Sequence, residues 1–396
     1  MPEPAPAADP WPLAIAFVVD RFGARFGGAE AYGVALMREL AAAGHRITVF
    51  AREYDEACGL TLPFVPIVTS RHWPSWIRVF LFARRAARAT RSGFDIVHSH
   101  MNGWCGDVEV VHVTPVRYRW RVQPMSVAKR ALSYLSPRVR TYLGLEARRV
   151  ATRPGHQVVA VSALIAHQLL QAYGERLRVP VIPPGVSRPD ARAPDRRAAT
   201  RDELKLDADA HVCLLVARNP MRKGLPTALR ALARLPAAVH LLVVGANAAA
   251  RDEVRGAPEP VRARVRLVGE TSDVSSYYQA ADCYVHPTLN DSFGMAPLEA
   301  MSFGLPVVLS PAPWCGFAQY VRAGEDALVI SHPEHADELA EAIERLRTDA
   351  GLRCRLGAGA QQLLERHAWP EVARQYLALY ARILDERAAQ IQPRTQ

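Results

Sequence analysis

The stretch HPTLNDSFGMAPLEAMSFGLP, residues 286–306, follows a short apolar run and places two acidic residues beside a glycine. The run 283–286 predicts a buried strand. Asp291 and Ser292 are residue types that cap helices, and we expect a helix from about Met295. Backbone N–H groups in the first turn of a helix have no partner inside it, so they can bind phosphate or hydroxyl groups. The stretch therefore predicts a strand, a turn and a helix start that together bind a ligand.

Two carboxylates frame this predicted helix start. Asp291 and Glu299 are eight residues apart, close to two helical turns, which would place both side chains on one side. Carboxylates so placed accept hydrogen bonds from sugar hydroxyls. An ordinary capped helix after a buried strand explains the same pattern without a ligand, and this stretch alone leaves both interpretations open.

The same residues resemble the signature of the retaining family 4 (group 1) glycosyltransferases, in which an acidic residue is followed, after seven residues, by a glutamate. Asp291, Phe293, Gly294 and Glu299 occupy the positions of that signature. The resemblance implies that Glu299 holds the ribose of a nucleotide. It also implies that the transferred sugar is bound by the residues Asp291, Ser292, Phe293, Gly294 and Met295. The family usually has Glu where this chain has Asp291, so the shorter side chain leaves the identity of the sugar open.

Length and composition restrict the class of protein. The 396 residues are enough for two domains, and 49% apolar with 22% charged residues is typical of a globular chain. We find neither a transmembrane run nor the pattern of a signal peptide, and we expect a cytoplasmic protein. The six cysteines have no close pair and no spacing typical of a metal site, so we expect reduced thiols, with Cys213 and Cys283 as small core residues.

The positive charge is confined to the first half. Residues 1–187 contain 23 Lys and Arg against 13 Asp and Glu, whereas residues 188–396 contain 26 of each. Basic residues are densest between 71 and 153, where they are interleaved with aromatic residues. This pattern suits an anionic partner such as acidic lipids, a phosphorylated glycan or nucleic acid, and the helix expected over Pro74 to Arg91 is our candidate for a membrane surface. Arg-rich helix faces in contact with water alone also explain it.

The first half opens with an anion-binding pattern. An apolar run, 13–19, predicts a parallel strand, and Gly27 and Gly28 lie in the loop before a helix expected over 31–43. The resemblance implies that these glycines line the diphosphate of the donor.

Histidines end two further predicted strands of this half. His98 and His100 alternate at the end of one strand, so they share a face, but no further metal ligands lie nearby in sequence. His112 follows the next strand. The resemblance implies that His112 lies beside the transferred sugar, while a histidine at a strand end with no such role is the alternative.

The second half restarts the pattern of strands and helices. Arg218 and Lys223 follow the strand expected over 212–217, five residues apart. The resemblance implies that both hold the diphosphate, where fixed positive charge stabilises the departing nucleotide. Arg222 is a possible substitute for Lys223, although the register favours Lys223, and two exposed loop cations without a ligand are the alternative. The resemblance also places Gly245 close to the donor and Glu270 where the base is recognised. With these cations present we expect no metal ion and no cofactor.

The resemblance extends over about residues 13–385 and implies the α/β GT-B fold of two doubly wound Rossmann-like domains facing across a cleft. We expect an acceptor-binding domain over 1–184, of which 1–12 is a tail, and a nucleotide-sugar domain over 185–370. In the remainder, 371–396, we expect a helix that crosses back to the first domain.

Residues 314–321 differ from the usual family pattern. With the prolines and glycine at 183–185, they resemble the branch that adds hexose to the lipopolysaccharide core. UDP-glucose is therefore the expected donor, ahead of GDP-mannose and UDP-N-acetylglucosamine. The expected acceptor is a lipopolysaccharide core or another cell-surface glycan or glycolipid, with peripheral contact to the anionic inner-membrane surface.

Other functions remain open at this point. A sugar-nucleotide epimerase shares the architecture, and an inverting transferase would need a positioned base. A non-enzymatic basic protein that binds membrane or another anion ranks last, and no nucleic-acid partner is expected, because the neutral second half carries the most specific motifs.

Overall fold

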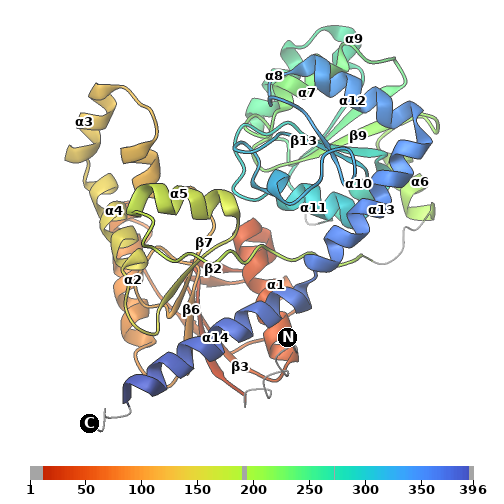
Figure 1. The fold of residues 1–396 in the computed structure, drawn as a ribbon. Coiled ribbons are helices and arrows are strands. Elements are labelled where there is room, and N and C mark those ends of the chain that lie inside the picture. The colour runs from red at the N-terminus through yellow and green to blue at the C-terminus, as the bar shows by residue number, and fades with distance from the viewer. Residues whose placement is uncertain (1–11, 190–193, 272, 392–396) are drawn as a thin grey trace. The chain divides into compact units, whose positions relative to one another are not determined.

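The computed structural model describes residues 12–189, 194–271 and 273–391 (Figure 1). The chain divides into two compact units. Unit 1 contains the residues up to 183 together with those from 369 onward, and unit 2 contains residues 184–368. The division falls one residue before the predicted boundary at 184/185 and two before the one at 370/371.

Unit 1 is built on a sheet of six parallel strands in the order β5-β3-β1-β6-β7-β8. Its strands are β1 (Ala14–Val18), β3 (Arg46–Ala51), β5 (Phe64–Pro66), β6 (Ile96–Ser99), β7 (Val108–Val111) and β8 (Gln157–Ala160), and a separate short pair is formed by β2 (Arg21–Phe22) and β4 (Glu53–Tyr54). Successive residues of β1 are buried on opposite faces: Phe17 belongs to one apolar cluster and Val18 to another. Both faces are therefore covered, which explains why the strand is apolar throughout.

Helices cover both faces of this sheet (Figure 1). On one face lie α1 (Gly28–Ala42), α5 (Ala163–Tyr173) and α14 (Trp369–Ile391), and on the other lies α2 (Ser75–Ala89). The remaining elements of unit 1 are α3 (Val127–Leu135), α4 (Pro137–Val150) and the short turns η1 (Ala24–Phe26), η2 (Glu56–Cys58) and η3 (Tyr118–Val122). The predicted closing helix packs within unit 1, with Tyr376 and Tyr380 fully buried.

The basic and aromatic residues 115–155 predict a long helical segment around Val127 to Val150, and this prediction is wrong. The structure has two helices, because Pro137 disfavours a helical conformation at the residue before it. Ser136 ends α3 and caps α4, its side chain accepting a hydrogen bond from the backbone N–H of Val139.

Unit 2 repeats the architecture with six parallel strands in the order β11-β10-β9-β12-β13-β14. The strands are β9 (His211–Val216), β10 (Val239–Val244), β11 (Val265–Val268), β12 (Cys283–His286), β13 (Val307–Leu309) and β14 (Leu328–Val329). The helices are α6 (Pro194–Glu203), α7 (Leu225–Leu232), α8 (Ala248–Gly256), α9 (Glu259–Arg262), α10 (Ser275–Ala280), α11 (Met295–Ser302), α12 (Ala336–Thr348) and α13 (Ala350–Arg366), with the turn η4 (Gly316–Gln319).

In each sheet the strand that comes first along the chain, β1 or β9, lies in the middle. The next two strands are added on one side of it, and the order then reverses, with β6 or β12 on its other side. This is the doubly wound order of a Rossmann-like domain, in which ligands bind outside the carboxyl ends of the strands at the reversal. The prediction of two Rossmann-like domains is confirmed. Among the residues that the structure describes, no helix is long and apolar enough to cross a membrane.

Candidate active site

The loops that follow β9 and β12 bring Lys223 and Asp291 together. The Lys223 ammonium pairs with Asp291 Oδ2, and their side chains are only 15% and 19% exposed. The same carboxylate oxygen lies 2.9 Å from Nε2 of His286, the buried last residue of β12. Two nitrogen-bearing side chains thus hold one carboxylate in place at the reversal point of the sheet.

The electrostatics of Asp291 follow from these partners. Burial alone would raise the pKa of its carboxyl group. The hydrogen bond from His286 and the charge of Lys223 outweigh burial and hold this pKa below its ordinary value, so Asp291 is ionised at neutral pH. Burial, in turn, lowers the pKa of His286 despite the neighbouring carboxylate.

A glycine allows the two loops to approach this closely. A Cβ atom at Gly224 would lie 2.0 Å from the carbonyl oxygen of Pro287, and its φ of 92° favours glycine as well. Next to it, the backbone N–H of Leu289 donates to the carbonyl of Arg222 over 3.0 Å. A backbone hydrogen bond therefore fixes the loop next to Lys223, and the ion pair with Asp291 fixes its side chain.

The helix begins at Met295 as predicted, but its capping differs from the expectation. The N-cap is Gly294, with φ of 109° and no capping side chain, rather than Asp291 or Ser292. The backbone of Asp291 instead forms hydrogen bonds with the segment after β13. Its N–H donates to the carbonyl oxygen of Trp314, and its carbonyl oxygen accepts from the N–H of Gly316. The first turn of α11 is left without a side-chain cap, as an anion or hydroxyl site requires.

Glu299 and Phe293 differ in their surroundings. Tyr278 donates its hydroxyl hydrogen to Glu299 Oε2 over 2.9 Å, while burial raises the pKa of the Glu299 carboxyl group. The Phe293 ring is buried and packs against Phe317 and Tyr320, so only its backbone is suited to ligand binding. The segment from Asp291 to Glu299 is not wholly helical, because Asp291 precedes the helix and only Glu299 lies on it.

The remaining predicted residues of unit 2 lie after β9, β10 and β11. Arg218 Nη2 donates to Glu270 Oε1 over 2.6 Å, and both side chains are more than half exposed. Gly245 follows β10 and has a φ of 90°, and a Cβ atom there would lie 2.3 Å from the carbonyl oxygen of Ala217. All these residues share the carboxyl edge of the sheet.

In unit 1 the predicted glycines flank the start of α1. Gly27 is the N-cap, with φ of 154° and ψ of 177°, a conformation open almost only to glycine, and Gly28 is the first helical residue. A Cβ atom added at Gly28 would meet nothing within 4 Å, so packing within the protein leaves room for at least a methyl group there.

His112 belongs to a group of rings near the same strand ends, in which His98 is buried while His100 and His112 are half-buried. Its ring centroid lies 4.4 Å from that of His100, and His98 Nε2 lies 3.0 Å from His100 Nε2. His98 also contacts the Tyr380 hydroxyl through Nδ1 at 2.5 Å. The expectation that His98 and His100 share a face is confirmed. Burial lowers the pKa of both His98 and His112 to about 3, so the rings are neutral at physiological pH.

Both units match family models. Residues 26–188 match the model described as Glycosyltransferase Family 4, and residues 210–349 match Glycosyl transferases group 1. This chain belongs to the family 4, group 1 glycosyltransferases. It is accordingly a transferase of the GT-B type.

Relatives of this glycosyltransferase extend over most of the chain. It is 29% identical to D-inositol 3-phosphate glycosyltransferase of Xylanimonas cellulosilytica, with 92% of this chain and 93% of that protein covered. It is 26% identical to the lipopolysaccharide glucosyltransferase WaaG of Escherichia coli K12, with 92% and 95% covered.

Solved structures show the same fold. A crystal structure of WaaG matches with a TM-score of 0.76 at 21% identity, covering 92% of this chain and 99% of that one. A crystal structure of Anabaena Alr3699/HepE in complex with UDP and glucose matches with a TM-score of 0.72 at 20% identity, covering 93% and 99%.

Sequence reasoning about this glycosyltransferase assigned no role to His286. The available signal was its place as the last residue of a strand, five residues before Asp291 and separated from it by a turn that starts at Pro287. The pairing of Arg218 with Glu270 was equally invisible, since 52 residues separate them.

Proposed function

We propose that this glycosyltransferase moves a hexose from a nucleoside diphosphate, with UDP-glucose as the first candidate, to a glycan or glycolipid acceptor with retention of the anomeric configuration. The observation that carries the proposal is the Lys223–Asp291–His286 group beside the uncapped start of α11. It offers a cation for phosphate, a fixed carboxylate for sugar hydroxyls and the backbone N–H groups of a helix start without a side-chain cap, all within one site.

The proposed roles follow the chemistry of each group. Lys223 and Arg218 bind the diphosphate with the loop of Gly27 and Gly28, and Glu299 binds the ribose. Asp291 and the backbone of residues 292–295 bind the sugar. Gly245 allows close approach of the donor, Glu270 lies beside the base, and His112 orients the sugar.

In the proposed reaction the bond between the anomeric carbon and the phosphate oxygen breaks, and a bond to the acceptor oxygen forms on the same face. The acceptor's proton passes to the departing phosphate oxygen, so no enzyme nucleophile is needed. Arg218 and Lys223 stabilise the charge that grows on the diphosphate, which is why we propose neither a metal ion nor a cofactor for the transfer step.

The relatives support this choice of substrates. WaaG is named a lipopolysaccharide glucosyltransferase, and HepE has been solved in complex with UDP-glucose. Another relative is named for D-inositol 3-phosphate, an anionic acceptor that would also suit the basic first half of the chain. Lipopolysaccharide core and inositol phosphate are therefore the two acceptors to test first.

The first experiment is a thermal-shift panel of UDP-glucose, UDP-galactose, UDP-N-acetylglucosamine, GDP-mannose, UDP and GDP. A ligand at 100 times its dissociation constant adds about 2.7 kcal/mol of stability. We expect a shift selective for one base in the wild type and in Glu341→Ala, an exposed control on α12, and no such shift in Glu299→Ala. The absence of a shift with every nucleotide would refute the proposed donor site.

Product analysis separates the remaining enzyme classes. Retention is read from the anomeric configuration of the product by NMR. An inverted product would exclude the proposed mechanism, and conversion of the donor without any acceptor would indicate an epimerase.

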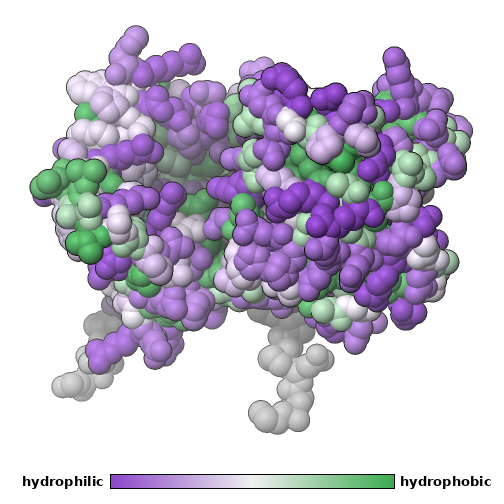
Figure 2. All heavy atoms as spheres, turned by 90° about the horizontal axis from the view of Figure 1, so that it is seen from above, coloured by the Kyte–Doolittle hydropathy of each residue, from purple (hydrophilic) through white to green (hydrophobic). Residues whose placement is uncertain are grey.

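We also propose peripheral contact with an anionic membrane, on the cytoplasmic face of the inner membrane. The helix favoured from sequence, α2, buries Phe82 and Ala86 in unit 1, so much of its apolar face is occupied. The helix α3 instead leaves Val127 85%, Leu132 67% and Leu135 77% exposed. Hydrophobic residues gather at the left edge of Figure 2, on the side where Figure 1 places α3.

Basic residues surround this apolar surface. Lys129 on α3 and Arg138 and Arg140 on α4 are all exposed. Apolar side chains beside Lys and Arg are the pattern that inserts into the headgroup region of an anionic bilayer.

Vesicle co-sedimentation tests the membrane contact. The wild type and Val68→Asp, an exposed control elsewhere in unit 1, are expected to bind vesicles containing anionic lipid, and Leu132→Asp with Leu135→Asp is expected to lose binding. Equal binding by this double variant would exclude α3 as the contact.

A further inference from the structure

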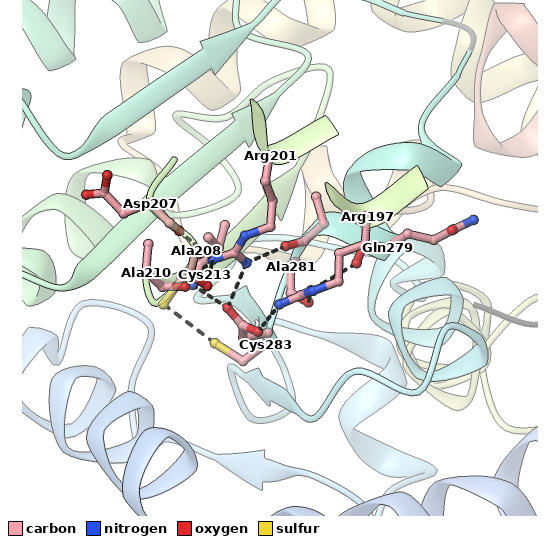
Figure 3. A network of polar contacts seen from close by, with 12 residues as sticks. Arg197, Arg201, Asp207, Ala208, Ala210, Cys213, Gln279, Ala281 and Cys283 are labelled. Atoms are coloured by element: carbon pink, nitrogen blue, oxygen red, sulfur yellow. Dashed lines mark hydrogen bonds and ion pairs between the residues drawn. The ribbon is translucent and has the colours of Figure 1, made fainter. Parts of the chain in front are cut away.

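Two cysteines and a histidine meet at the amino edge of the unit 2 sheet, opposite the candidate active site. Cys213 in β9 and Cys283, the first residue of β12, are directly paired in the sheet. Their sulfur atoms lie 3.5 Å apart (Figure 3). Together with a ring nitrogen of His211, the first residue of β9, the possible ligand atoms all lie within 4.8 Å of one another.

The cluster is buried and chemically incomplete. Cys213 is 2% and Cys283 0% exposed. His211 Nε2 is buried as well and has no hydrogen-bond partner within the described part of the chain. The half-buried His211 side chain hydrogen-bonds to Cys283, but an unpaired polar atom inside a protein costs free energy, so its Nε2 atom requires an explanation that a hydrophobic core does not give.

The separation of the sulfur atoms distinguishes three interpretations. A disulfide bond would need about 2.0 Å between them. Two sulfurs bound at about 2.3 Å to one tetrahedral zinc ion lie roughly 3.8 Å apart, close to the observed 3.5 Å. A pair of thiols joined by a weak S–H···S hydrogen bond, with the His211 side chain hydrogen-bonded to Cys283, fits the distance too, but gives no partner to His211 Nε2.

The residue before each cysteine fixes the two strands against each other. Asp282 accepts a hydrogen bond from the backbone N–H of Val212 over 2.8 Å. It also pairs with Arg197 and Arg201 of α6, whose guanidinium groups bind further backbone carbonyls around the start of β12 (Figure 3). The positions of the two sulfurs are therefore set by a surrounding hydrogen-bonded network, as metal ligands require.

We propose that His211, Cys213 and Cys283 bind a zinc ion. Two thiolates and an imidazole are the soft and borderline ligands that this ion prefers, and a water molecule completes the tetrahedron. Binding replaces two thiol protons, which leave to solvent, so the site with its ion is electrically neutral. The ion joins β9 to β12 at the end remote from the donor loops and stabilises unit 2. This role is independent of the proposed transfer reaction.

Cobalt is the probe for this site, because Co²⁺ occupies zinc sites and absorbs visible light. We expect the reduced, chelator-treated full-length chain to bind one Co²⁺ with thiolate charge-transfer and tetrahedral d–d bands. Added Zn²⁺ is expected to remove these bands and to raise the melting temperature. The absence of cobalt bands in the folded wild type would overturn the proposal and leave a thiol pair only.

Variants assign the ligands. Cys213→Ser, Cys283→Ser and His211→Asn are each expected to lose the bands, whereas Cys354→Ser, at the exposed cysteine of α13, retains them. Circular dichroism checks that each variant is folded. Bands that persist in folded Cys213→Ser or Cys283→Ser, or that vanish in Cys354→Ser, would contradict the assignment.

The zinc content of the untreated wild-type protein, measured by mass spectrometry, gives an answer that does not depend on any variant. About one ion per chain supports the site, and the absence of zinc opposes it.

Discussion

The two sheets have the same strand order, yet the side chains at their reversal points differ in charge. In unit 2, Lys223 and His286 hold an ionised Asp291. In unit 1, the buried His98 and the half-buried His112 are uncharged at neutral pH and lie among aromatic rings. Shared topology thus provides two similar places for a ligand, while the residues decide which chemistry each place supports.

Lowering the pH is expected to give the largest effect, because it acts against the uncharged histidines of unit 1. The folded-state pKa of His98 and of His112 is lowered to about 3, below an unfolded value of about 6.5. Below pH 6.5 the unfolded chain binds protons that the folded chain does not, so the free energy of unfolding falls as the pH falls, until the folded pKa is reached. At pH 5 each histidine has lowered the free energy of unfolding by about 2 kcal/mol relative to its value above pH 6.5. Denaturant titrations at pH 7.5, 6 and 5 measure this, and His112→Gln should flatten the profile. A profile independent of pH would show that these rings are not buried and neutral.

A methyl group at Gly224 should disrupt the charged group of Lys223, Asp291 and His286 in unit 2. A Cβ atom there would lie 2.0 Å from a backbone oxygen, and a left-handed conformation costs another residue about 1–2 kcal/mol before that clash is counted. Gly224→Ala should therefore lower the free energy of unfolding by about 2 kcal/mol or more and impair turnover. Gly256→Ala at the end of α8, where an added Cβ atom meets nothing within 4 Å, is the matched control in calorimetry. Equal melting temperatures for the two variants would contradict the close approach of the loops.

Loss of the Lys223 charge tests whether the cation serves the reaction. Lys223→Ala is expected to reduce turnover at least tenfold, about 1.4 kcal/mol of activation free energy, with UDP-glucose as donor. Arg222→Ala, which removes the neighbouring exposed cation, should retain near-normal turnover. If Lys223→Ala were as active as wild type, this residue would have no part in the mechanism.

The smallest effect is expected at the exposed pair of Arg218 and Glu270. Their side chains are 54% and 74% exposed, so water screens the attraction. Glu270→Gln should change the free energy of unfolding by less than about 1 kcal/mol, measured by urea titration. A larger loss would mean that this ion pair stabilises the fold, unlike an ordinary surface pair.

Much of the fold was predictable because it depends on local patterns. Apolar runs separated by helical segments indicate parallel sheets, and residues after the runs, such as Lys223 and Asp291, must then share one edge. The Lys223–Asp291 contact itself was not predictable, since it depends on the close approach at Gly224. Sequence reasoning favoured α2 for the membrane, because charge and apolar content are readable from sequence but burial of Phe82 is not.

Two further differences between the sequence-based predictions and the structure have similar causes. Pro137 was visible in the sequence, but the basic and apolar pattern continued through it and suggested one helix. Cys213 and Cys283 were treated as unrelated core residues because 70 positions separate them, and only the register of β9 with β12 places them side by side. Contacts between distant strands require a register, which a single sequence does not provide.

The position of α14 has a consequence for synthesis on the ribosome. Tyr376 and Tyr380 of this last helix are fully buried in unit 1, where Tyr376 accepts a hydrogen bond from Tyr32 and Tyr380 contacts His98. Residues 184–368 emerge earlier, so unit 2 is complete in sequence while unit 1 still has an open hydrophobic face. A nascent or truncated chain that ends before 369 would therefore expose that face to chaperones and proteases, although its second unit were already folded.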